Sequence, residues 1–575
     1  MCKKIMFFGL LFSFSFLYAQ ENDTLPKKDF GRVYGGFESN GQWYLNDKER
    51  GRDQPNDPLR SNSYLFVNYQ IGKWTAGVQV ESYLKEALLN YNPDFTGVNL
   101  GTYFLNYKTN KLDVTAGHFY EQFGSGMILR AWESRNLGIN SAIMGGRVIY
   151  RPISDVKLTA LYGQQRSGFS VSDGKIFGFD SEFQLTNALK FEKSDLSLGL
   201  SYVGRYEKTD IPDPNFNELT NAYSARLNYS YDAFYSSIEY NYKSEDAIID
   251  RISNQIKNDF VRSGNALLFN LGYSKQGLGI DATFRRTENM LFLSERVPTP
   301  IAALDINGLP TTKLSSEFSD KVLNFTPALT KQHHSLLANI YVYQAQVGVE
   351  FKSNQILKAG ETGGQIDVFY EFAKETPLGG KYGTKLSLNA ASWYNLPGQY
   401  RATPADYETN FFGVGTRYYT DYNLEIKKKV SEKLHTGFTY INQFYNKRWV
   451  EDQPVEVNTN IVAAEFTYNF QENKSIRFEG EHLWADTDFK NWVGGTLELD
   501  LNNKYSFFIL DVYNYGNDDV NERTHYYNFG GAYRINSTRI GLSYGRQRGG
   551  LVCVGGVCRV VPPSSGVGLT VSSSF

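Results

Sequence analysis

The sequence predicts an all-β protein, a large transmembrane antiparallel β-barrel of about 24 strands with short periplasmic turns and long extracellular loops. Three observations predict it: an aromatic-rich composition, a period-two alternation along many segments, and connections that alternate between short and long. In 575 residues, Tyr (41), Phe (40) and Trp (7) together make 15% of the chain, beside 52 Gly and 3 Cys. Disordered chains are poor in aromatics, so this composition indicates a folded protein.

The charge balance excludes one class of partner. Lys and Arg total 59 against 61 Asp and Glu, a net charge of −2. A nucleic-acid-binding protein would show a basic excess or a basic stripe. We therefore expect no nucleic-acid partner.

The first residues have the pattern of a secretory signal peptide. Lys3 and Lys4 precede an uncharged apolar run, residues 5–18, and a small residue, Ala19, stands before the expected cleavage point. The apolar run is too short to cross a bilayer as a helix. Residues 1–19 are therefore predicted to be a signal peptide and residues 20–575 the mature barrel, exported to the cell outer membrane.

The predicted strands are recognised by alternation of apolar and polar residues. In residues 196–206, Leu196, Leu198, Leu200 and Tyr202 alternate with small or polar residues, which places the two sets on opposite faces of a strand. The same pattern recurs along the chain, at residues 223–231, 234–242, 267–273, 278–284, 366–372, 386–390, 476–478, 497–501 and 540–544. Aromatic residues stand at many strand ends, where the interfacial girdles of a membrane barrel lie.

The connections between these segments are of two kinds. The expected short turns are Gly72-Lys73, Thr109-Asn110-Lys111, Ser154-Asp155, Ser194-Asp195, Asn502-Asn503-Lys504 and Asn536-Ser537. Long polar loops are expected at residues 47–60, 208–220 and 515–522. Short periplasmic turns and longer extracellular loops are typical of transmembrane barrels.

Residues 290–364 are the least regular segment. Pro298, Pro300, Pro310 and Pro327 favour a long extracellular or lumen-folded loop, although residues 339–352 could add a strand pair. The expected strand number is therefore 24, or 26 with that pair. The apolar stretches 300–304 and 336–343 would be costly in water, so we expect them to pack inside the mouth or against a partner.

Charged residues on the polar face are expected to line the lumen. Both signs are present, which favours ion pairs that brace the wall over a single-signed selectivity ring. These expected lumen-facing residues are Arg205, Arg226, Glu239, Asp281, Arg285, Asp367, Arg477, Glu479, Glu498 and Arg539.

The last strand carries an expected assembly signal. Val567, Leu569, Val571 and the terminal Phe575 lie on one face. This arrangement resembles the signal read when bacterial outer-membrane barrels are assembled. It implies the outer-membrane barrel assembly machinery and outer-membrane lipid as partners, with other envelope proteins as further candidates.

The chain also resembles a particular group of barrels. A signal ending in Ala19-Gln20, strands rich in Tyr, Asn and Lys, and the terminal Phe575 look like Bacteroidota outer-membrane β-barrel proteins. The tail resembles that of an uncharacterised family from that phylum. It contains Cys553-Val554-Gly555-Gly556-Val557-Cys558, followed by Arg559 and Pro562-Pro563. The resemblance implies the barrel fold and no activity.

A disulfide is expected between Cys553 and Cys558. The segment is symmetric about Gly555-Gly556, a favoured two-residue hairpin turn, so the two cysteines fall opposite each other. An exported protein reaches an oxidising compartment, where the bond persists. A metal site is the alternative, but two thiolates without nearby His make a poor one. Residues 549–563 are expected to form the last extracellular hairpin.

The sequence offers little evidence for catalysis, a cofactor or a metal. The six His form no metal-binding spacing, and the adjacent His333 and His334 are expected to be loop decoration. His482 near Asp486 and Asp488 is the one acid–histidine group, and no nucleophile motif accompanies it. The chain is therefore not expected to be an enzyme.

The function indicated by these features is a channel or transport pore for polar solutes. A barrel this wide must be water-filled, plugged by loops or occupied by a partner, because wall side chains alone cannot fill it. A barrel subunit of a secretion or surface-assembly complex is the alternative, and an outer-membrane enzyme is the second alternative.

Overall fold

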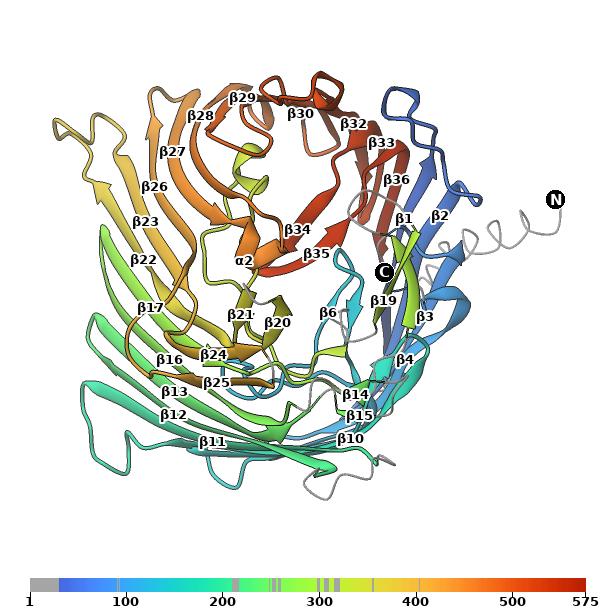
Figure 1. Ribbon diagram of the computed structural model, residues 1–575, viewed down its shortest axis with the longest axis vertical. Coiled ribbons are helices and arrows are strands. Elements are labelled where there is room, and N and C mark those ends of the chain that lie inside the picture. Colours follow the sequence, from blue (N-terminus) through green and yellow to red (C-terminus); the bar gives the residue numbers. More distant parts are fainter. Residues whose placement is uncertain are drawn as a thin grey trace, which may run out of the picture.

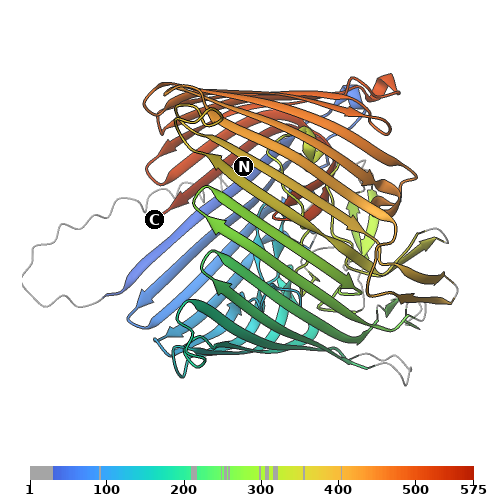
Figure 2. The same ribbon diagram turned by 90° about the vertical axis from the view of Figure 1, so that its left-hand side faces the viewer.

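The computed structural model is a barrel of strongly tilted strands with parts of its own chain inside (Figures 1 and 2). It describes residues 30–575 apart from 90, 91, 93, 209–216, 248, 251–254, 257–259, 297–299, 305–309, 315–320, 354, 355 and 403. The predicted signal peptide, residues 1–19, lies outside the described residues. Among the residues described, no helix combines the length and the apolar character needed to cross a bilayer.

The described residues form one 24-stranded antiparallel sheet that closes on itself. Its strands in chain order are β1 (Arg32–Tyr44), β2 (Leu59–Ile71), β3 (Trp74–Glu86), β4 (Thr96–Lys108), β5 (Leu112–Phe119), β8 (Ile143–Tyr150), β9 (Val156–Ser167), β10 (Ser170–Gln184), β11 (Ser194–Tyr206), β12 (Leu219–Tyr231), β13 (Phe234–Asp246), β16 (Arg262–Lys275), β17 (Leu278–Glu288), β22 (Gly360–Phe372), β23 (Thr384–Tyr394), β26 (Arg417–Lys429), β27 (Leu434–Asn446), β28 (Glu456–Gln471), β29 (Lys474–Ala485), β30 (Trp492–Leu501), β31 (Tyr505–Tyr513), β32 (His525–Ile535), β33 (Thr538–Gln547) and β36 (Ser564–Ser574).

The first and last strands close the barrel. β1 pairs with β36 from Gly36↔Ser574 to Tyr44↔Gly566. Phe575 extends this pairing beyond β36, because its N–H and C=O exchange hydrogen bonds of 3.0 and 2.9 Å with Gly35. The predicted fold class is therefore confirmed, and every wall strand pairs with its sequence neighbours apart from this closing pair.

Two sequence expectations about the wall were wrong. Residues 339–352 add no strand pair to the barrel: their end belongs to β20 (Glu350–Ser353), which pairs only with the short β21 (Ile356–Lys358). Ser194-Asp195 is not a turn but the start of β11, and residues 185–193 make the connection. The Thr186 hydroxyl accepts a hydrogen bond from Leu196 N–H at 3.0 Å. This contact stabilises a connection that lies before Ser194 in the chain.

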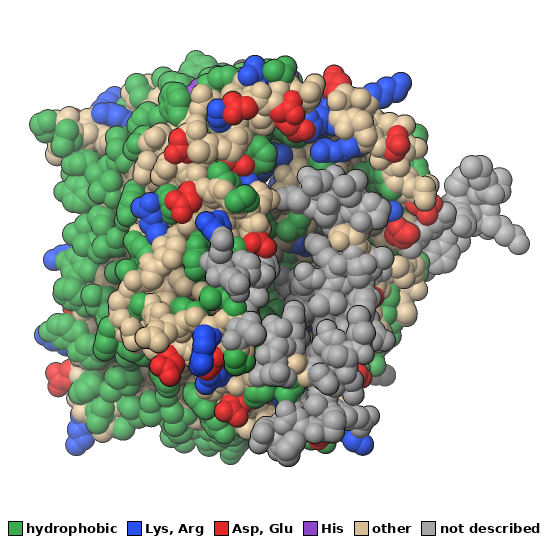
Figure 3. All heavy atoms as spheres, viewed as in Figure 1, with side chains coloured by type: hydrophobic (Ala, Val, Ile, Leu, Met, Phe, Trp, Pro, Cys, Tyr) green, Lys and Arg blue, Asp and Glu red, His purple; other side chains and the backbone are tan. Residues whose placement is uncertain are grey.

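The outer face of the wall is apolar. Leu200, Leu227, Ile238, Phe269 and Ile366 are all exposed there. Figure 3 shows hydrophobic side chains gathered along the left-hand and lower parts of the outer rim. Side chains that alternate along a strand face opposite sides, so the inner face receives the polar set.

Aromatic rings pair across neighbouring strands beside the short turns. The ring centroids of Trp74 and Tyr107 lie 4.8 Å apart, and so do those of Phe234 and Tyr273. Exposed aromatic side chains at strand ends are the arrangement expected where a membrane barrel meets the interface.

The two ends of the barrel differ. Short connections such as 72–73, 232–233 and 536–537 gather at one end, here called the short-turn end, and the long loops gather at the other, the long-loop end (Figure 2). The described loop elements are η2 (Lys48–Arg50), β6 (Glu133–Ser134), β7 (Ile139–Asn140), β14 (Ile249–Asp250), β15 (Gln255–Ile256), β18 (Pro300–Leu304), β19 (Pro310–Leu314), β20, β21, η6 (Leu337–Asn339), β24 (Gly398–Ala402), β25 (Ala405–Thr409), α2 (Lys447–Glu451), η7 (Val520–Glu522), β34 (Gly550–Val554) and β35 (Val557–Val561).

Candidate functional site

The lumen contains three segments of the chain itself. They are residues 120–142 between β5 and β8, the described residues of 289–359 between β17 and β22, and residues 548–563 between β33 and β36, and we call them together the lumen segments. Figure 1 shows β6, β20, β21, β34 and β35 inside the ring of wall strands.

An apolar cluster joins two lumen segments to the wall. Apolar side chains of the first and second lumen segments pack together against the inner wall. The cluster contains Phe123, Met127, Ile128 and Leu129 of the first segment, Met290, Phe292 and Leu323 of the second, and wall residues that include Leu161, Ile176, Val203 and Ala222. Burying apolar side chains is favourable by about 1.5–3 kcal/mol for each large one. This part of the lumen is therefore a packed core rather than a water channel.

Inner-wall arginines hold the start of the second lumen segment. Arg205 of β11 donates to the Leu293 carbonyl at 2.7 Å and pairs with Asp246 at 2.6 Å. Arg296, from the segment, pairs with the same Asp246 at 2.9 Å. Burial lowers the pKa of Arg296, with the Arg205 charge adding to that effect. The Asp246 carboxylate, 10% exposed, thus bridges a wall cation and a lumen cation.

The middle of the second lumen segment is attached to three wall carboxylates. Lys331 pairs with Glu425 of β26 at 3.3 Å, and His333 contacts Asp421 of the same strand at 2.8 Å. Glu481 of β29 accepts from Ser335 Oγ and from the N–H groups of residues 336 and 337, at 3.0 and 3.1 Å for the latter two. A carboxylate at the start of η6 satisfies N–H groups that lack intrahelical partners.

Tyr343 and Glu361 form the next attachment. The Tyr343 ring stacks on Tyr419, with centroids 5.2 Å apart, and on Trp393 at 6.2 Å. Its hydroxyl donates to Glu361 of β22. Glu361 also accepts from Gln346 N–H at 2.7 Å and from Arg285 at 2.5 Å. Burial, then the Glu361 charge, raises the pKa of Tyr343 well above its usual range.

The cysteine hairpin is the third lumen segment, and it carries the predicted disulfide between Cys553 and Cys558. Gly555 and Gly556 occupy the turn with φ of +59° and +79°, which a two-residue hairpin of this type requires. The hairpin folds inward: Ala328 N–H donates to the Gly556 carbonyl at 2.9 Å, and Gln332 donates to the Cys553 carbonyl at 3.0 Å. It therefore packs on the second lumen segment.

Three of the charged residues assigned to the lumen from sequence contact a lumen segment. Arg205 and Arg285 contact the second lumen segment, and Glu239 accepts from Ser125 N–H of the first at 3.0 Å. Others pair within the wall or line a cavity: Arg226 with Asp180, Asp281 with Tyr235, Asp367 with Asn389, Arg477 with Glu479 and Glu498, and Arg539 beside a cavity.

Water-accessible space remains nearer the short-turn end. A cavity of about 630 Å³ is lined by polar residues such as Arg151, Asp155, Lys157 and Glu182. A second, of about 520 Å³, lies against the inner faces of β2–β5. A third, of about 340 Å³, lies beside Asp500 and Arg539. Both charge signs occur in all three linings.

The histidines hold loops and walls together in ways that sequence reasoning missed. His333 and His334 are not loop decoration, because His333 contacts Asp421 and His334 lies 2.7 Å from the Arg477 guanidinium. Ligand atoms of His334, Glu465 and Glu479 lie within 4.8 Å of one another, and Arg477 contacts all three side chains. The Arg477 guanidinium supplies the positive charge that balances the Glu465 and Glu479 carboxylates.

The acid–histidine group proposed around His482 does not assemble. His482 Nε2 contacts the Tyr515 hydroxyl at 2.7 Å. Asp486 instead accepts from Asn458, and Asp488 pairs with Lys447 at 3.0 Å. These carboxylates hold neighbouring loops at the long-loop end.

Comparisons with known proteins identify a family and several similar solved structures. Residues 1–575 match the model of a family described as "Family of unknown function (DUF6029)". No curated protein matches the chain. Solved structures similar to it include the siderophore receptor PirA from Pseudomonas aeruginosa, at 8% identity and a TM-score of 0.40, covering 96% of this chain and 81% of that one.

Two further solved structures are similar at the same level. The P pilus usher (PapC) translocation pore has 8% identity and a TM-score of 0.39, covering 94% of this chain and 99% of that one. A BenF-like porin from Pseudomonas fluorescens Pf-5 has 10% identity and a TM-score of 0.34, covering 83% and 97%. At these identities the likeness concerns the fold alone.

Proposed function

The chain belongs to this family of unknown function, and we propose that it is an outer-membrane pore for polar solutes whose passage is gated by its own lumen segments. The apolar outer face and the aromatic residues at strand ends support the membrane location. Export by the predicted signal peptide and insertion by the outer-membrane barrel assembly machinery belong to the same proposal. It assigns no enzymatic reaction to the chain.

One observation carries the proposal: the lumen combines polar cavities with segments that are attached largely by side-chain contacts. The cavity of about 630 Å³ is lined by charges of both signs, which suits hydrated solutes. Elsewhere in the lumen, the second lumen segment is held by Glu425, Asp421, Glu481 and Glu361. Contacts between side chains can break without disturbing the wall hydrogen bonds, so the segment can move while the barrel stays closed.

The test is conductance across planar bilayers. Purified wild-type barrel should give small, fluctuating steps. Glu481→Gln combined with Asp421→Asn weakens two attachments of residues 333–337 and should raise the mean conductance several-fold. The control is Glu371→Gln, at the exposed short-turn end of β22. Equal conductance in a folded double variant and the control would contradict gating by this segment, and no conductance in any variant would contradict a pore.

A further inference from the structure

A row of uncharged polar side chains crosses the inner wall. The register of the sheet places its seven members next to one another on seven consecutive wall strands, from β10 to β22. They are Gln184, Ser197, Asn228, Ser237, Asn270, Thr283 and Gln365, here called the polar row. Neighbouring strands lie about 4.8 Å apart, so the polar row is about 29 Å long. Each member is at least partly exposed, so an elongated ligand in the lumen can reach it.

Hydrogen bonds along the polar row leave capacity for a ligand. Asn228 Nδ2 donates to Ser197 Oγ at 3.1 Å, and Asn270 Nδ2 donates to Ser237 Oγ at 2.9 Å. Thr283 Oγ1 donates to Asn270 Oδ1 at 2.8 Å. A hydroxyl both accepts and donates, and an amide has two N–H protons. The two serine hydroxyls therefore keep a proton to donate, and each asparagine keeps a second N–H.

Charged residues flank the polar row on both sides. In the adjacent rows of the register they are Glu182, Arg226, Glu239 and Arg285 toward the long-loop end, and Asp195, Asp281 and Asp367 toward the short-turn end. These charges are engaged by neighbours: Arg226 pairs with Asp180 at 2.7 Å, and Asp367 accepts from Asn389 at 2.7 Å. The polar row is thus a neutral strip between charges that are already paired or hydrogen-bonded.

The cavity of about 630 Å³ lies on the polar row. Five members line it, namely Gln184, Ser197, Asn228, Ser237 and Asn270. Its charged lining residues balance, with the three cations Arg151, Lys157 and Arg226 against the three carboxylates Asp155, Glu182 and Glu239. Gly124 and Ser125 of the first lumen segment also line it. The space therefore favours neither sign of charge and presents mainly hydroxyl and amide groups.

The polar row connects the short-turn end with an attachment of the second lumen segment. Gln184 is the last residue of β10, at the short-turn end, whereas Gln365 lies in the middle of β22. From Gln365 the register continues through Ala391 to Asp421, whose carboxylate contacts His333 of the second lumen segment at 2.8 Å. Movement of that segment would therefore uncover the far end of the polar row.

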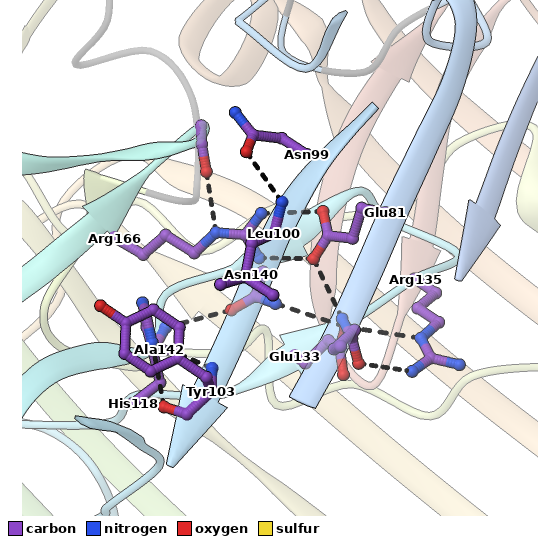
Figure 4. A network of polar contacts seen from close by, with 12 residues as sticks. Glu81, Asn99, Leu100, Tyr103, His118, Glu133, Arg135, Asn140, Ala142 and Arg166 are labelled. Atoms are coloured by element: carbon purple, nitrogen blue, oxygen red, sulfur yellow. Dashed lines mark hydrogen bonds and ion pairs between the residues drawn. The ribbon is translucent and has the colours of Figure 1, made fainter. Parts of the chain in front are cut away.

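The second cavity lies beside a different kind of wall. The space of about 520 Å³ follows β2–β5, where β4 pairs with β5 only over residues 104–108. A buried ion pair holds this region together, since Arg166 donates to both oxygens of Glu81 at 2.7 and 2.8 Å (Figure 4). Two amides of its lining, Asn68 and Asn106, lie away from the polar row and serve as matched controls.

We propose that the polar row is the binding track for a neutral oligosaccharide, which the pore conducts between the second lumen segment and the short-turn end. A chain of sugar hydroxyls offers donors and acceptors along its length, as the polar row does. Peptides are recognised through unpaired strand edges, aromatic grooves or arginine clusters. Every strand of the polar row is instead paired on both sides. This inference rests on the proposed pore and names its solute class.

The test is calorimetric titration of the purified full-length barrel with three neutral hexasaccharides: maltohexaose, cellohexaose and mannohexaose. We expect at least one to bind the wild type. Asn228→Ala combined with Asn270→Ala should weaken that binding about tenfold, because two amide partners are lost. The control, Asn68→Ala combined with Asn106→Ala, should change it by less than about twofold. Heat-modifiable gel mobility checks folding, and Ser197→Ala with Ser237→Ala replaces the first double variant if it does not fold.

Three outcomes would overturn the track. The first is no binding of any of the three hexasaccharides to the wild type. The second is equal binding of hexagalacturonate, a chitosan hexamer or a capped Gly-Asn hexapeptide, which would contradict recognition of a neutral sugar. The third is an equal loss of affinity in the control double variant. A barrel that conducts ions but binds no hexasaccharide contradicts this inference alone, whereas binding without any conductance contradicts the proposed pore.

Discussion

The hydroxyl of Tyr343 donates a hydrogen bond to Glu361, and this contact joins the second lumen segment to wall strand β22. The two residues lie 18 positions apart in sequence. Tyr343 belongs to the second lumen segment, whereas Glu361 belongs to the barrel wall. Arg285 of β17 meets the same carboxylate and also the Pro327 carbonyl at 2.6 Å. Glu361 is therefore the point where two wall strands and the lumen segment meet.

Alkaline pH should release the lumen segment at Tyr343. Its pKa in the folded protein is raised well above the usual value of about 10, so the unfolded or released segment loses this proton first. The stabilisation is thus fully present below pH 10 and falls as pH rises above it. Conductance should increase steeply above pH 10, and Tyr343→Phe should move that increase to higher pH. The exposed Tyr370→Phe is the control, and an identical pH profile for Tyr343→Phe and wild type would contradict this.

Glu361→Gln should destabilise the barrel. It leaves Arg285, which is 2% exposed, without its ionised partner, and breaking a buried pair in this way costs about 3–5 kcal/mol. The free energy of unfolding in urea, followed by heat-modifiable gel mobility, measures the loss. Glu371→Gln on the same strand should change it by less than about 0.5 kcal/mol. A loss of similar size in both variants would count against the role of the buried pair.

Reducing the disulfide should loosen the cysteine hairpin. Closing so short a loop stabilises it by about 2 kcal/mol in the chain-entropy description. Because the hairpin packs on the segment around Ala328 and Gln332, dithiothreitol should increase conductance fluctuations in the wild type. The double variant Cys553→Ser with Cys558→Ser should fluctuate without reductant and ignore its addition. Thiol labelling of the denatured, unreduced wild type should detect no free thiol, and two per chain would disprove the bond in the purified protein.

Deleting Phe575 should reduce assembly of the barrel. The deletion removes the last pair of backbone hydrogen bonds to Gly35 and the terminal aromatic side chain. We expect less heat-modifiable barrel in the membrane fraction and more degradation in the periplasm. Phe575→Ser separates the two effects, because it keeps the backbone pairing and loses only the ring. Unchanged folded levels after the deletion would remove the assembly role.

Ion selectivity should be weak. The inner wall pairs most of its charges with opposite ones, as Arg477 does with Glu465, Glu479 and Glu498, so the lumen presents no single-signed ring among the described residues. In a tenfold KCl gradient the reversal potential should lie near zero. A value close to the ideal potential for either ion would show a selectivity filter that this wall does not explain.

The sequence by itself determined the barrel, its short-turn end and the cysteine hairpin. These features depend on local patterns: side chains alternate with period two, turns need residues such as Gly555-Gly556, and neighbours along the chain become neighbours in the sheet. Such information lies within a few residues of each position. The charges assigned to the inner face follow from the same alternation.

Only the tertiary structure decided what fills the lumen and where the wall is incomplete. The sequence analysis did not predict that Phe123 and Met127–Leu129 pack inside the barrel with Phe292 and Leu323. The Arg166–Glu81 pair joins residues 85 positions apart across strands of unequal length. Contacts of this kind depend on how far each strand extends in the closed sheet, and that length is set by pairing with neighbours rather than by any residue alone.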